Sequence, residues 1–185
     1  SYFNENLLEI HQHEKLKCFF DTITNNDFTQ SKPNFIHAHL RLPHEPFIYD
    51  ENGELVSQKN QNDKSAYLSQ LKFSEKKILE IIDVIQLRSS DSVIILMSDH
   101  GFRSEINWEN PNKMDYMRGF NTITSFYFPN NSDEIPSEIS GVNIFRIFFN
   151  SYFNADYEIL ENRHIWYIPE KPFDFIEISQ SFKDL

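Results

Sequence analysis

The run VIILM at residues 93–97 is the sequence feature that most limits the range of folds open to this chain. It is entirely apolar and follows a long helical pattern at residues 64–88. A short continuous apolar run is typical of a strand buried on both faces, as in a parallel sheet. Residues 35–40, FIHAHL, lie between Pro33 and Pro43 and have the length of a strand. The order strand, helix, strand predicts a right-handed crossover and an α/β fold.

The rest of the chain predicts shorter elements around this unit. Helical spacing of apolar residues predicts helices over residues 5–23 and 142–153. Residues 122–128, 164–168 and 173–178 have the composition of strands, and residues 102–121 are expected to form a long loop. The helix over residues 64–88 has the clearest apolar stripe, formed by Leu68, Leu71, Ile78, Ile81, Ile82 and Ile85.

Composition excludes several classes of protein. The 185 residues are enough for one domain, and 18 Phe argue against disorder. With 17 basic and 28 acidic residues the net charge is −11, which disfavours nonspecific binding to nucleic acid or anionic lipid. No apolar run is long enough for membrane insertion by this segment, which is expected to be soluble by itself. The single Cys18 excludes an internal disulfide and a cysteine-based zinc site, and it is expected to be a small buried hydrophobe.

The string SDHG directly after the apolar run is the strongest chemical signal. Asp99 and His100 follow the end of a predicted strand, where ligand sites of open α/β sheets lie. Successive strand side chains point to opposite faces, so the two converge only if the chain leaves the strand between them. Gly101 permits such a turn, including one with positive φ. Carboxylate oxygen plus imidazole nitrogen is a common ligand set for zinc or manganese.

Two interpretations of this string stay open from the residues alone. Asp99 and His100 are a metal-ligand pair, or Asp99 caps a helix or turn and His100 is a surface residue. The first explains why a carboxylate stands beside an apolar strand, since burying an unpaired carboxylate is costly.

A second candidate site lies in the loop LRLPHEPF. His44 stands between Pro43 and Pro46, which restrict the backbone and reduce the entropy lost in fixing the imidazole. His44 is the candidate catalytic and substrate-binding residue, which contacts the substrate's oxygens, protonates a leaving group or binds a second metal. The competing interpretation is a loop histidine without a role.

Three more residues were considered as site candidates. Arg103 could balance an anionic substrate, because guanidinium matches phosphate and sulfate geometry, although a solvated loop arginine is an equal alternative. His37 and His39 alternate along the predicted strand and share a face, and they are expected to be hydrogen-bonded structural residues.

Two motifs taken together resemble a known family. PNFIHAHLRLPHEPFIYDENG and SVIILMSDHGFR, separated by the long helix, resemble the sulfatase-like branch of the alkaline phosphatase superfamily. NTITSFYFP and GVNIFRIFFNSYF resemble its continuation, so that residues 33–154 are covered. The resemblance implies a three-layer α/β/α sandwich around a mostly parallel sheet. It also implies that Asp99 and His100 bind a divalent metal ion (Zn, Mn or Ca) and that His44 binds substrate or a second metal.

The implied chemistry is hydrolysis or transfer of a phosphate or sulfate ester. In the family a metal-activated Ser, Thr or formylglycine attacks and forms a covalent intermediate. The partners expected are an anionic ester substrate and the rest of a parent chain. Family members are often membrane-anchored with the catalytic domain outside the cytoplasm, so a periplasmic or cell-surface location of the parent is expected.

The chain also departs from the family pattern. The family nucleophile and a further acidic ligand lie in the N-terminal half of the domain, whereas only one predicted helix precedes residue 33 here. Residues 1–185, which begin with Ser1 instead of Met, are therefore expected to be the C-terminal portion of a single domain, and to be inactive alone. Residues 102–120 contain no second-site histidine. These departures motivate an alternative, a degenerate non-catalytic module for binding or scaffolding.

Overall fold

The computed structural model describes residues 2–25, 33–56, 64–130 and 135–182. The chain divides into two compact units, Ser1–Ser92 and Val93–Leu185, and each is described by itself.

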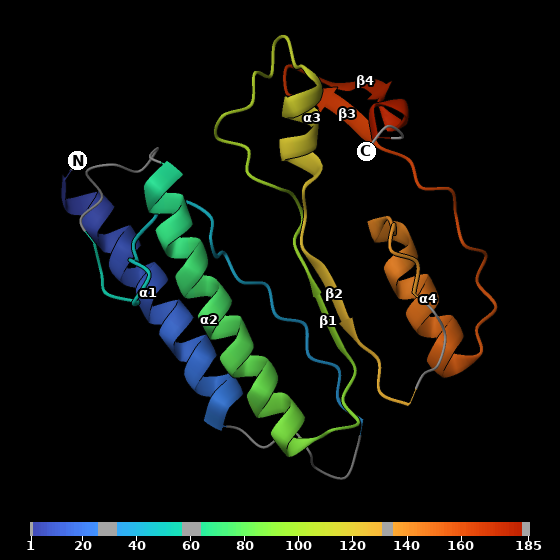
Figure 1. Ribbon diagram of the computed structural model, residues 1–185. Helices are drawn as coiled ribbons and strands as arrows, with labels where there is room; N and C mark the ends of the chain where they lie inside the picture. The colour runs from blue at the N-terminus through green and yellow to red at the C-terminus, as the bar shows by residue number, and fades with distance from the viewer. Residues whose placement is uncertain (1, 26–32, 57–63, 131–134, 183–185) are drawn as a thin grey trace. The chain divides into compact units, whose positions relative to one another are not determined.

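The first unit is built on two long helices. α1 spans Tyr2–Asn25 and α2 spans Lys64–Arg88, and Figure 1 shows them side by side, running in the same direction. Their C-terminal ends therefore meet, where the unpaired carbonyls carry partial negative charge. Arg88 compensates this charge, since its guanidinium donates to the carbonyl of Ile23 at 3.3 Å and to that of Thr24.

A small core joins these helices to the chain that follows the proline-flanked loop. It consists of the buried side chains Leu16, Ile48, Tyr49 and Phe73. The predicted helix over residues 64–88 is confirmed, but its most buried face differs from the predicted stripe. Gln70, Phe73 and Ser74 are buried, whereas Leu68 is 44% exposed. The prediction that Cys18 is buried is wrong, because its side chain is exposed.

In its described residues, the second unit contains two α-helices and two small sheets. Its elements in chain order are β1 (Ile94–Met97), α3 (Lys113–Phe120), β2 (Thr124–Tyr127), α4 (Gly141–Phe153), β3 (Ile165–Ile168), β4 (Lys171–Glu177) and a 3-10 turn, η1 (Ser179–Phe182). β1 pairs with β2 in an antiparallel ladder, and β3 pairs with β4 in an antiparallel hairpin. The predicted strands and helix of this half are thus confirmed within a few residues of their expected ends.

The predicted three-layer α/β/α sandwich with a mostly parallel sheet is wrong. In the described residues both sheets are two-stranded and antiparallel. The apolar run at residues 93–97 forms β1 as expected, but its residues are half-buried or, at Met97, exposed. An apolar run reports only that a strand has apolar neighbours. It does not show whether the neighbouring strand is parallel or antiparallel. Here the neighbouring strand is β2, which is antiparallel.

The predicted first strand of the crossover is also wrong. Residues 33–42 carry no strand assignment, and Phe35 is 81% exposed. A strand needs a neighbour for its backbone N–H and C=O groups. None of the ladders among the described residues includes this segment.

The described part of the chain contains no helix with the length and apolar character that crossing a membrane requires.

Candidate functional site

The ladder between β1 and β2 continues into the SDHG string. The backbone N–H of Ser98 donates to the carbonyl of Ile123, and the hydroxyl of Ser98 accepts from the N–H of Ile123, both at 3.0 Å. Ser98 is therefore fixed at the end of the sheet. Asp99 and His100 follow it at the carboxyl end of β1, as the sequence predicts.

The Asp99 and His100 side chains converge. The backbone N–H of His100 donates to Asp99 Oδ1 at 3.0 Å, and His100 Nδ1 lies 2.7 Å from the carbonyl oxygen of Gly101. A carbonyl only accepts, so Nδ1 carries the hydrogen, and the neutral imidazole keeps its lone pair on Nε2. The two atoms left over, Asp99 Oδ2 and His100 Nε2, are 3.8 Å apart.

This arrangement fits two ligands of one metal ion. In a tetrahedral site with bonds of about 2.1 Å, two ligand atoms are separated by about 3.4 Å. The separation of 3.8 Å is close to that value. Metal-binding histidines commonly donate their other ring N–H to a carbonyl, which is the role of Gly101 here.

Gly101 is required for a reason other than the predicted one. Gly53, not Gly101, is the glycine with positive φ among the described residues, so Gly101 does not use the conformational freedom considered for it. Instead, the N–H of Gly101 donates to the carbonyl of Gly119 at 2.9 Å. A Cβ at position 101 would lie 2.0 Å from the carbonyl oxygen of Arg118 and 2.8 Å from that of Asn121. Only glycine lets the chain pass so close to the end of α3.

α3 lies within residues 102–121, which were predicted to be a loop. Asn112 and Asp115 begin it with reciprocal bonds: the Asn112 side chain accepts from the Asp115 N–H, and the Asp115 carboxylate accepts from the Asn112 N–H. The spacing of Asn and Asp in NKMD is the sequence signal that could have found this helix.

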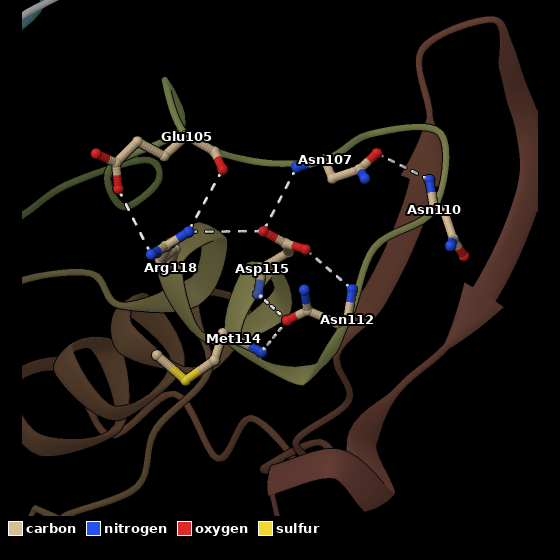
Figure 2. A network of polar contacts seen from close by, with 7 residues as sticks. All are labelled: Glu105, Asn107, Asn110, Asn112, Met114, Asp115 and Arg118. Atoms are coloured by element: carbon tan, nitrogen blue, oxygen red, sulfur yellow. Dashed lines mark hydrogen bonds and ion pairs between the residues drawn. The ribbon is translucent and has the colours of Figure 1, made fainter.

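Figure 2 shows how the start of α3 is tied to the preceding loop. Asp115 is only 2% exposed, and its Oδ1 atom lies 3.4 Å from the Asn107 nitrogen and 3.8 Å from Arg118 Nη1. Arg118 also pairs with the carboxylate of Glu105 at 3.5 Å. The network ties residues 105–112 to α3.

An aromatic cluster holds the other side of α3. Trp166 of β3 is 4% exposed, stacks on Trp108 with 5.1 Å between ring centroids, and meets Tyr116 edge-on at 5.0 Å. Phe120 and Ile106 pack in the same cluster. The SDHG string is therefore supported by a chain of contacts that leads from Trp166 through α3 to Gly101.

The loop with His44 belongs to the first unit. The peptide bonds Leu42–Pro43 and Glu45–Pro46 are both cis. His44 is exposed, and its Nδ1 atom lies 2.6 Å from the Glu45 carbonyl oxygen and 3.4 Å from Arg41 Nη2. A single Nδ1 cannot donate to the carbonyl and accept from Arg41 at once. The shorter contact decides for a hydrogen on Nδ1, which leaves Nε2 as the reactive nitrogen, as in His100.

The base of this loop is held by Gln70, which sequence reasoning missed. Gln70 is 0% exposed, and its amide bonds to the backbone at His44, Ile48 and Tyr49. Gln70 lies outside the predicted apolar stripe, so that stripe gave no signal for it. Tyr49 is further held by a 2.8 Å bond between its hydroxyl and His13 Nδ1.

The remaining predicted residues lie as follows. Arg103 stacks its guanidinium on Trp108, 4.6 Å from the ring centroid, which leaves its N–H groups at the edge of the plane. His37 and His39 are exposed on the extended segment, and their expected role as hydrogen-bonded structural residues stays a prediction.

Burial does not explain the Asp99 and His100 pair. Their side chains are 81% and 35% exposed, so the expected cost of burying a carboxylate is absent. Among the described residues no group of three or more His, Cys, Asp and Glu is placed to hold a metal ion. A four-ligand metal site would need two ligands besides this pair.

A tight turn follows the His44 loop. The Oδ1 atom of Asp50 accepts from the N–H groups of Asn52 and Glu54 at 2.8 and 2.9 Å. The bonds from Glu54, and then from Asn52, hold the pKa of the Asp50 carboxyl below its ordinary value. At this turn Gly53 has φ +89°, and a Cβ there would lie 2.6 Å from the Phe73 ring.

We expect Asp50→Asn to make the first unit less stable near neutral pH and no less stable in strong acid. The folded pKa of Asp50 is below the unfolded value of about 3.9, so the stabilisation is present above that value and is lost as pH falls through the folded pKa. Urea unfolding of both proteins over a pH series measures this. A difference between the two that does not change with pH would contradict the assignment.

Comparisons with known proteins identify no relative: no family model, no curated protein and no solved structure matches this chain.

Proposed function

We propose that this chain is part of a metal-dependent hydrolase or transferase of phosphate or sulfate esters, in which Asp99 and His100 ligate the metal. One observation carries the proposal. Asp99 Oδ2 and His100 Nε2 lie 3.8 Å apart, while the other polar atom of each side chain, Asp99 Oδ1 or His100 Nδ1, is hydrogen-bonded to the backbone. Such prior fixing of the ligands is what a metal site needs, because it sets the imidazole tautomer.

A bound divalent ion supplies a Lewis acid that polarises the ester and activates a nucleophile. Zn, Mn and Ca each fit a carboxylate ligand, while an imidazole nitrogen favours Zn or Mn. The nucleophile is proposed to lie in a part of the parent protein that precedes the residues of the family resemblance. The substrate is an anionic ester, and Arg103 offers it guanidinium N–H groups.

His44 is proposed to act on the substrate through Nε2. With Nδ1–H directed at the Glu45 carbonyl, Nε2 ligates a second metal as neutral imidazole, or donates to a substrate or leaving-group oxygen as imidazolium. The His44 ring is exposed while the following residues Phe47 and Ile48 are buried, which suits a histidine that contacts a bound substrate.

The site of action proposed for the parent protein is the periplasm or the cell surface, with an anchor outside this sequence. This part rests on the family resemblance alone.

A degenerate binding or scaffolding module is the second candidate. It is favoured by the finding that the described residues offer a pair of metal donors and no larger group. The module and the enzyme differ in turnover, which the following experiment measures.

We expect the double replacement Asp99→Ala and His100→Ala in the full-length parent to lower metal-dependent hydrolysis of aryl phosphate or sulfate esters by more than about 100-fold. Loss of a residue that merely supports a ligand already costs 10- to about 100-fold, and here the ligands themselves are lost. His39→Ala, a replacement of an exposed histidine outside the site, is the matched control. Stoichiometric zinc or manganese measured by elemental analysis should fall in parallel.

Full activity in the double variant would show the hydrolase assignment to be wrong. A parent that binds one metal ion through Asp99 and His100 but turns over neither ester would instead identify the module.

A further inference from the structure

We propose that Gln70 is the positioning residue for His44, and that its side-chain amide sets the direction in which the imidazole meets the substrate. This inference rests on the role given to His44 under the proposed function. It concerns a residue on α2 that carries none of the chemistry itself.

Gln70 uses both ends of its amide on the backbone of one loop. Its Oε1 atom accepts from the N–H groups of Ile48 and Tyr49 at 2.8 and 3.2 Å. Its Nε2 atom donates to the carbonyl of His44 at 3.0 Å. The side chain is 0% exposed, so water does not compete for these bonds.

Pro43 and Pro46 restrict the backbone of the loop, and hydrogen bonds complete its fixation. Residues 41–48 form no helix or strand; the Ile48 carbonyl accepts from the Val56 N–H at 3.0 Å, while the Ile48 N–H and the His44 carbonyl bond to the Gln70 side chain. Phe47 and Ile48 are buried, with 4% and 1% of their surface exposed, and they fix the far end of the loop, whereas His44 is exposed. The bond from Gln70 is the link between the buried base and the histidine's own backbone.

The bond also fixes the ring. His44 Nδ1–H reaches the Glu45 carbonyl at 2.6 Å, and the peptide group between the two residues carries the His44 carbonyl that Gln70 holds. If that peptide group turns, the Glu45 carbonyl moves away from Nδ1. Gln70 therefore controls which nitrogen of His44 keeps the hydrogen.

Gln70→Glu separates positioning from folding. Burial raises the pKa of a Glu at position 70, so the comparison is made at alkaline pH, where the carboxylate still accepts from Ile48 and Tyr49 but cannot donate to His44. The base of the loop then stays bonded while the histidine is released. Ser74→Ala is the matched control: Ser74 is 2% exposed on the same face of α2 and donates only within the helix, to the Gln70 carbonyl at 2.7 Å.

Long-range ¹H–¹⁵N spectra of the imidazole report the tautomer. We expect a single Nδ1–H form of His44 in the parent protein and in Ser74→Ala, and a mixture of tautomers in Gln70→Glu. An unchanged His44 spectrum in a folded Gln70→Glu protein would overturn the proposal. The spectra need neither metal nor substrate, so they decide the role of Gln70 even if the hydrolase assignment fails.

Kinetics give the second readout in the full-length parent. A misplaced catalytic group costs on the order of 100-fold, so kcat/KM of Gln70→Glu should fall by about that factor while Zn²⁺ affinity stays within about twofold. An equal loss of Zn²⁺ affinity would mean that the replacement acts through the fold, against the proposal.

If Gln70→Glu does not fold, hydrogen exchange on the unaltered protein decides. The amide protons of Ile48 and Tyr49 should exchange as slowly as those in the middle of α2, since a buried Gln70 oxygen holds them. Fast exchange of both would refute the positioning role.

Discussion

Gly101→Ala is expected to destabilise the second unit by at least about 3 kcal/mol and to abolish the metal binding proposed for Asp99 and His100. Overpacking of a tight site costs about 1–3 kcal/mol and occasionally more, and here the obstacle is backbone that cannot rotate away. The added Cβ would lie 2.0 Å from the Arg118 carbonyl oxygen. The chain must move away from α3, and the Gly101 carbonyl moves with it. His100 Nδ1 then loses the hydrogen bond that sets the tautomer of the ring.

The other glycines provide a graded control. Gly141→Ala, at the first residue of α4, meets nothing within 4 Å and should be neutral or stabilising, since alanine is the better helix former. Gly119→Ala, which would bring a Cβ to 3.1 Å from the Trp166 ring, should lie between the two. Urea unfolding and zinc titration measure the series. A Gly101→Ala protein with unchanged stability and zinc affinity would contradict the close approach of Gly101 to α3.

The sequence predicted the elements better than their arrangement. α2 and α4 were found because their apolar residues repeat at helical spacing, and β1 because its run is short and entirely apolar. Neither pattern indicates whether the neighbouring strand is parallel or antiparallel. The prediction of a parallel sheet therefore had no direct support, and the antiparallel β1–β2 pairing shows that it is wrong. α3 was missed because eight residues with one capping signal and weak periodicity resemble a loop.

The candidate site could be predicted only in part for the same reason. Asp99 and His100 are adjacent in the sequence, and a local turn is enough to bring them together. The residues that hold the site in place act over distance: Gln70 reaches His44 across 26 positions. Such contacts depend on packing that no short motif records.

Trp166→Ala is expected to cost about 3–5 kcal/mol in the stability of the second unit and to loosen the SDHG string. Removing a buried tryptophan leaves a cavity whose lining relaxes only partly. Trp166 is 4% exposed and packs against Trp108, Tyr116 and Phe120. Without it, α3 loses its packing surface, and the Gly119 carbonyl no longer holds the Gly101 N–H.

Two further variants separate packing from the other properties of the side chain. Trp166→Phe keeps part of the ring and removes an indole N–H that is buried without a partner among the described residues, so it should cost less. Phe173→Ala, on β4 of the same hairpin and 89% exposed, should change stability by less than about 0.5 kcal/mol. Urea unfolding gives the stability, and hydrogen exchange of the Gly101 amide reports the string itself. Because the string is held through α3, that amide should exchange much faster in Trp166→Ala than in Phe173→Ala. Equal exchange in the two variants would mean that β1 and β2 alone fix Asp99 and His100, and that the aromatic cluster has no part in the candidate site.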